Sequence, residues 1–147
     1  MKKNILVITV LIVIILSGCN RNAAEMITNG KVMINKEERT ITFHGILTDK
    51  NLEPDTSFQA RFFLQGSTIR NAVGTDLVYS DKELKSDSDP AESEKYDVQA
   101  TLKIKQPDKI EELVKVINDK EEKAVTIEVI NDKGRLDDQV IHKVVEK

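Results

Sequence analysis

The segment from Tyr96 to Lys105 alternates between apolar and polar side chains for ten consecutive residues. Its apolar positions are Tyr96, Val98, Ala100, Leu102 and Ile104. Successive side chains of a β-strand point to opposite faces, so this period of two predicts a strand with one face buried and the other in water. A chain that contains such a strand must supply partner strands and a second layer to cover the apolar face.

Six further segments carry the same signal in shorter form. In one of them Phe58, Ala60, Phe62 and Leu64 alternate with more polar neighbours, and turn-forming residues such as those at 131–134 separate the segments. The sequence therefore predicts about seven strands, at 31–35, 40–47, 58–65, 76–80, 96–105, 125–130 and 139–146.

The segment 108–119 departs from this period. Ile110, Leu113, Val114 and Ile117 recur at the spacing of one helical face. Seven short strands with one helix between the fifth and sixth predict an all-β fold, namely a sandwich of the immunoglobulin or fibronectin type. In that architecture the connection that holds the helix crosses between the two sheets. An α+β sheet with the helix packed on one face is the alternative.

The first nineteen residues have the form of an export signal. Lys2 and Lys3 precede a predominantly apolar stretch at residues 5–16, and these twelve residues are fewer than the roughly 20 that span a bilayer. The stretch ends in Leu16-Ser17-Gly18-Cys19, which resembles the lipobox of bacterial lipoproteins. This resemblance implies cleavage between Gly18 and Cys19 and a diacylglyceryl group on the Cys19 thiol, which is the only thiol in the chain.

The resemblance divides the chain into a signal peptide at 1–18, a lipid anchor and tether at 19–30, and one β-rich domain at 31–147. By its strand pattern, the domain is similar to the immunoglobulin-like accessory domains of Gram-positive lipoproteins. The expected location is then the outer face of a cell membrane, with the membrane contacted through the acyl chains on Cys19. The abundance of Lys, Ile and Asn favours a Gram-positive source.

The charge balance excludes one class of partner. Removal of residues 1–18 takes away Lys2 and Lys3, which leaves 20 basic residues against 25 acidic ones and a net charge of −5. Nucleic-acid binding requires a basic surface that neutralises phosphates. We therefore expect no nucleic-acid partner.

Two sets of residues are candidates for contact with a ligand. Phe63 points away from the core if Phe62 points into it. Acidic residues also fall in three predicted loops, at 48–56, 81–95 and 131–139, which meet at one end of an up-and-down sandwich. We expect a cation such as Ca²⁺ or a basic partner there; the candidate residues are Asp49, Asp55, Asp87, Asp89, Asp137 and Asp138.

No catalytic motif stands out in the sequence. It contains no Gly-x-Ser-x-Gly and no phosphate-binding glycine loop, and neither His44 nor His142 has a zinc-ligand spacing. These observations favour a lipid-anchored binding or accessory module that contacts an envelope protein or ligand and has no cofactor other than a possible Ca²⁺ ion. The alternative is a small cell-envelope hydrolase whose carboxylates are brought together by the fold.

Overall fold

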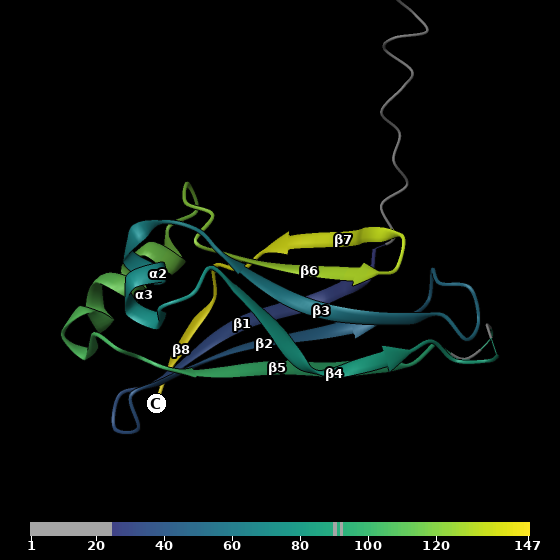
Figure 1. Cartoon of the computed structure of the whole chain (residues 1–147), viewed down its shortest axis with the longest axis horizontal. Helices are drawn as coiled ribbons and strands as arrows, with labels where there is room; N and C mark the ends of the chain where they lie inside the picture. The colour runs from purple at the N-terminus through teal and green to yellow at the C-terminus, as the bar shows by residue number, and fades with distance from the viewer. Residues whose placement is uncertain (1–24, 90, 92) are drawn as a thin grey trace, which may run out of the picture.

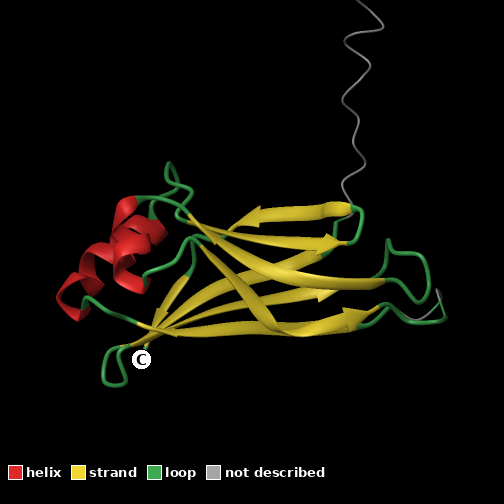
Figure 2. Ribbon diagram, in the orientation of Figure 1, coloured by secondary structure: helices red, strands yellow, loops and turns green. Residues whose placement is uncertain are grey.

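The computed structural model describes residues 25–89, 91 and 93–147. They form eight strands, two α-helices and a short 3₁₀ turn, η1 (Figures 1 and 2). The elements in chain order are β1 Ile27–Asn35, β2 Thr40–Thr48, β3 Ser57–Leu64, α2 Ser67–Val73, β4 Leu77–Lys85, β5 Lys95–Lys103, η1 Pro107–Lys109, α3 Ile110–Asn118, β6 Val125–Asn131, β7 Gly134–Val140 and β8 Val144–Glu146.

The strands form two four-stranded sheets that pack face to face. The first sheet has the order β5–β2–β1–β8 and the second has the order β4–β3–β6–β7. All neighbouring strands are antiparallel except β8, which runs parallel to β1. Strands one, two and five share one sheet and strands three, six and seven the other, as in immunoglobulin-type sandwiches. The predicted all-β sandwich is confirmed.

The core lies between the sheets and consists of the inward half of each alternating pattern. Phe43 of the first sheet meets Phe62 of the second, with ring centroids 5.6 Å apart and planes tilted by 31°. A Cβ atom on Gly45 would collide with the terminal methyl group of Ile127 from the opposite sheet. The sheets approach closely at this point, which explains the glycine inside β2.

Both helices close the same end of the sandwich (Figure 2). As predicted, η1 and α3 lie on the connection from β5 in one sheet to β6 in the other, and Leu113 and Ile117 of α3 are buried. The sequence did not predict α2, because seven residues are two turns and too short to show a helical period. Gly74 ends α2 in the left-handed conformation, at φ 80°.

Several strand limits differ from those expected. β1 begins at Ile27 rather than at residue 31, and Met26 is already fully buried. β4 continues through charged residues to Lys85. The register shift between Gln59 and Arg61 of β3 disturbs the alternation of β4, so the sequence pattern ended this strand at residue 80. The segment predicted as one strand at 139–146 contains the end of β7 and all of β8, which belong to different sheets.

The end of the sandwich opposite the helices is formed by loops 49–56 and 86–94 and by the β6–β7 hairpin; we call it the loop end (Figure 1). The chain enters the fold here, because the backbone N–H of Thr48 donates to the carbonyl of Met26 at 2.8 Å. The predictions for residues 1–24, including Gly18 and Cys19, lie outside the described residues. Within the described part of the chain, none of the helices has the length and apolar character needed to cross a membrane.

Substitution of two adjacent phenylalanines tests the inward and outward assignment of β3. Phe62 is fully buried, so Phe62→Ala should lower the free energy of unfolding by about 3–5 kcal/mol. Phe63 is 39% exposed, so Phe63→Ala should cost less than about 1 kcal/mol. Urea unfolding of a chain that starts at Glu25 measures both, and equal losses would contradict the assignment.

Candidate functional site

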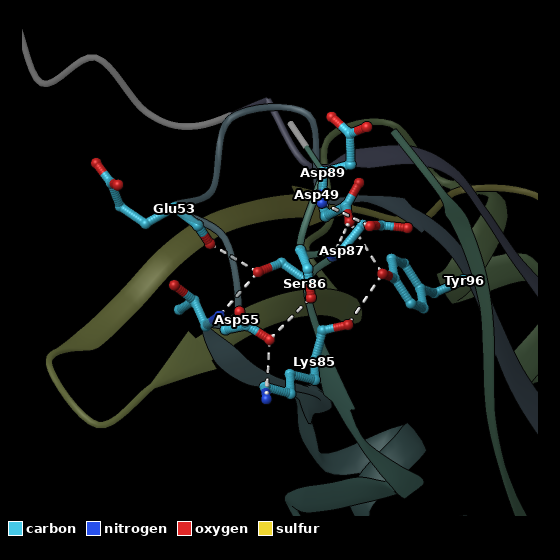
Figure 3. A network of polar contacts seen from close by, with 10 residues as sticks. Asp49, Glu53, Asp55, Lys85, Ser86, Asp87, Asp89 and Tyr96 are labelled. Carbon is cyan, nitrogen blue, oxygen red and sulfur yellow. Dashed lines mark hydrogen bonds and ion pairs between the residues drawn. The ribbon is translucent and has the colours of Figure 1, made fainter. Parts of the chain in front are cut away.

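The loop end brings two of the three predicted acidic loops together around one buried carboxylate (Figure 3). Asp49 is only 6% exposed. Its carboxylate accepts hydrogen bonds from the backbone N–H groups of Asp87 at 2.8 Å and Glu94 at 3.0 Å, and from the Tyr96 hydroxyl at 2.9 Å. A buried carboxylate with three donors is well satisfied, so Asp49 ties loop 49–56 to loop 86–94.

These contacts shift the protonation of both side chains. Burial alone raises the pKa of Asp49, but the hydrogen bonds from the Asp87 backbone, the Tyr96 hydroxyl and the Glu94 backbone outweigh it and leave the pKa below its ordinary value. Burial raises the pKa of Tyr96, and the neighbouring Asp49 carboxylate raises it further. The charged Asp49 and the neutral Tyr96 therefore stabilise each other at neutral pH.

The other acidic loop residues also form ion pairs or hydrogen bonds with neighbouring groups of the loop end. Asp55 pairs with the Lys85 ammonium group at 3.0 Å, and Asp87 and Asp89 accept hydrogen bonds from backbone N–H groups two residues later. The crevice beside Asp49, Asp87 and Asp89 measures about 10 Å³, which is at most the space of one water molecule. Across residues 25–89, 91 and 93–147, no three His, Cys, Asp or Glu side chains are arranged to hold a metal ion.

Asp137 and Asp138 do not belong to a loop, which corrects the sequence prediction. Both lie inside β7, whose charged sequence hides its strand character at the sheet edge. One oxygen of Asp137 accepts the backbone N–H groups of Met26 and Ile27, at 2.8 and 2.9 Å. Asp137 thus holds the chain at the point where it enters the fold.

The second surface is the outward side of the β4–β3–β6–β7 sheet, which we call the outer face. Pairing of the strands arranges it in three rows of four side chains. In strand order β4–β3–β6–β7 the rows are Leu77–Phe63–Thr126–Val140, Tyr79–Arg61–Glu128–Asp138 and Glu83–Gln59–Ile130–Arg135. Among the described residues, the exposed large hydrophobic side chains are Phe63 at 39% and Tyr79 at 49%, and both lie here.

A charged network runs across the middle of the outer face. Glu128 is 9% exposed, and its carboxylate accepts hydrogen bonds from Arg61 Nε at 2.6 Å and Arg135 Nη1 at 3.3 Å. The hydrogen bond with Glu128 raises the pKa of Arg61, and so does the contact of Arg61 with Tyr79. Arg135 also lies 3.5 Å from Asp138. The two arginines and two carboxylates balance in charge.

Sequence reasoning identified Phe63 but missed the rest of this surface. Tyr79 and Arg61 come together only because β4 pairs with β3, and Glu128 joins them through β6. The outward position of Glu128 between inward Ile127 and Val129 was a usable signal, but its partner depends on strand register. Register cannot be read from one strand alone.

The outer face ends in a depression of about 620 Å³ beside the β6–β7 hairpin. Glu83 and Asp132 line it together with Gln59 and Lys133, so the envelope-hydrolase alternative depends on these two carboxylates. Among the described residues, His44 and Asp97 form a histidine–carboxylate pair at 2.9 Å. His44 belongs to β2 and Asp97 to β5, so this pair lies on the other sheet.

The fold and its two surfaces define a class: a small all-β sandwich with a crossover helix, a braced loop end and an aromatic outer face. Comparisons of the chain with models of protein families, with curated proteins and with solved structures find no match. Any function of this chain therefore has to be inferred from its own residues.

Replacement of Asp49 tests its role as a brace between the loops. Asp49→Asn should lower the free energy of unfolding at pH 7 by roughly 1–3 kcal/mol. The asparagine NH₂ group is itself a donor, so it cannot accept the hydrogen bonds that one carboxylate oxygen accepts in the parent. The folded-state pKa of Asp49 is lowered, so its contribution is present above the unfolded pKa of about 4 and is lost as the pH falls through the folded pKa. The variant should therefore lose less stability than the parent between about pH 5 and pH 2.

Asp55→Asn is the matched control, because the Asp55 side chain is 56% exposed. Its backbone φ of 58° is one that asparagine also tolerates. This variant should change stability by less than about 1 kcal/mol. Equal effects of the two substitutions in denaturant titrations would contradict the brace.

Proposed function

We propose that this chain is a lipid-anchored extracytoplasmic accessory module that acts by contact at the outer face of a cell membrane. The proposal combines the lipobox resemblance of Leu16 to Cys19 with the outer face of the sandwich. Two acyl chains on Cys19 would give stable anchoring, because each buried methylene contributes about 0.8 kcal/mol.

The observation that carries the contact role is the pair of exposed aromatic residues. Single exposed hydrophobic residues are common on protein surfaces, but Phe63 and Tyr79 occupy diagonal positions on adjacent strands. Half-buried Leu77 extends the apolar area, and Arg61 lies beside Tyr79. Tyr and Arg side chains beside exposed apolar residues are typical of protein interfaces.

The position of Met26 limits how the module would stand on the membrane. Seven residue steps separate Cys19 from Met26 and reach at most about 25 Å when fully extended. The loop end would therefore stay close to the lipid headgroups. Phe63 lies near the far end of β3, about 20 Å further out at 3.3 Å per residue.

Cys19→Ser tests the anchor. The parent chain should partition into detergent with a mature mass that begins at Cys19 and includes a diacylglyceryl group. The variant should lack this lipid mass and accumulate with residues 1–18 attached, since a serine hydroxyl does not replace the lipidated thiol. Asn20→Ser is the control and should be processed like the parent; an unchanged mature mass of Cys19→Ser would refute the anchor.

A further inference from the structure

The three rows of the outer face can be matched with the same rows of a second copy by a two-fold rotation. If a second copy is rotated by 180° about an axis parallel to the strands and midway between β3 and β6, then β3 faces β6 of the other copy and β4 faces β7. The rows keep their height along the strands, so each row faces itself in reverse order. Strand pairing thus determines which side chains meet.

We propose that the outer face pairs with the outer face of a second copy of this chain about that axis. The apolar row is self-complementary under the rotation. Phe63 faces Thr126 of the second copy, and Leu77 faces Val140. The ring of Phe63, which is exposed in one copy, is then covered by a smaller side chain that leaves room for it.

The two polar rows are complementary in charge. Arg61 faces Glu128 of the second copy, and Tyr79 faces Asp138, so its hydroxyl has a carboxylate acceptor. In the last row Glu83 faces Arg135 of the second copy. The rotation places no like charges opposite each other, whereas like charges would cost affinity.

The membrane anchor selects this axis, and here the inference rests on the proposed function. A two-fold axis parallel to the strands leaves both loop ends, and both Met26 residues, on the same side of the pair, because Met26 precedes β1 at the loop end. The other two-fold axis in the plane of the face would point the two loop ends in opposite directions. Where the long axes stand upright on the bilayer, two anchored copies can form only the first arrangement.

The size of the face indicates where pairing occurs. Three rows on four strands cover about 19 by 20 Å, or roughly 400 Å² per copy, about half of the 800 Å² per partner of a standard stable interface. The soluble domain should therefore be monomeric. Anchoring raises the effective concentration and orients both copies, which compensates for the small area.

The test uses the full chain in the membranes of bacteria that export and lipidate it. Thr126→Cys places a thiol on β6, next to the proposed two-fold axis, and lipidation blocks Cys19, so a short thiol-to-thiol cross-linker should give covalent dimers. Thr101→Cys, which lies on the exposed side of β5 in the other sheet, is the control and should give few. Equal yields at the two positions, or no dimer with Thr126→Cys, would overturn the pairing.

Charge reversal separates specific pairing from collision. Glu83→Arg, added to Thr126→Cys, places an arginine opposite Arg135 of the second copy at two symmetric places in the dimer. It should reduce cross-linking about three- to tenfold. Co-expression with a chain that carries both Arg135→Glu and Thr126→Cys should restore part of the yield. Glu121→Arg, at the exposed helical end, makes the same charge change and should have no effect; unchanged yield with Glu83→Arg would contradict the charge pairing.

Failure of the anchor would be visible in a different measurement. The unsubstituted chain should not react with a maleimide after denaturation, because Cys19 carries lipid. A reactive Cys19 would refute the proposed function and remove the membrane argument for the axis. A blocked Cys19 without cross-linking at Thr126→Cys would refute the pairing alone.

Discussion

The contact between Phe43 and Phe62 across the sandwich is the constraint on which the rest of the structure depends. With Phe62 in the core, the period of two turns both of its neighbours, Arg61 and Phe63, to the outer face. A slip of one residue would bury the arginine and expose Phe62. The core therefore determines which side chains the protein presents outside, although none of them contributes to the core.

The sequence predicts most of the fold because each layer has one buried face and one solvent-exposed face, which gives the sequence a periodic apolar pattern. Strict alternation at 96–105 and the helical stripe at 108–119 indicate the sandwich and the crossover helix, and both agree with the structure. The predictions fail where that signal disappears. Edge strand β7 carries charges, and two-turn α2 is too short for a period. The outer face depends on register between strands, so the sequence predicted Phe63 and missed its neighbours.

The acidic residues have a structural explanation that composition did not supply. A net charge of −3, or −5 after the expected removal of residues 1–18, suggests a cation or a basic partner when loop carboxylates are clustered. In the structure Asp49 braces two loops, and Asp137 holds the start of β1. Asp137 connects the point of chain entry to the sandwich, and Asp49 joins two loops at the same end, so an anchor at Cys19 would act on a chain start that is held to the domain.

The intermolecular distance between outer faces tests this account most directly. Pulsed electron–electron double resonance on vesicle-bound chains with a spin label at position 126 should give one narrow distance distribution at short distance, because facing sheets lie about 10 Å apart. A label at position 101 should give a distance longer by about two further sheet spacings, or roughly 30 Å between backbones. Broad distributions at both positions, or the shorter distance at position 101, would contradict the account.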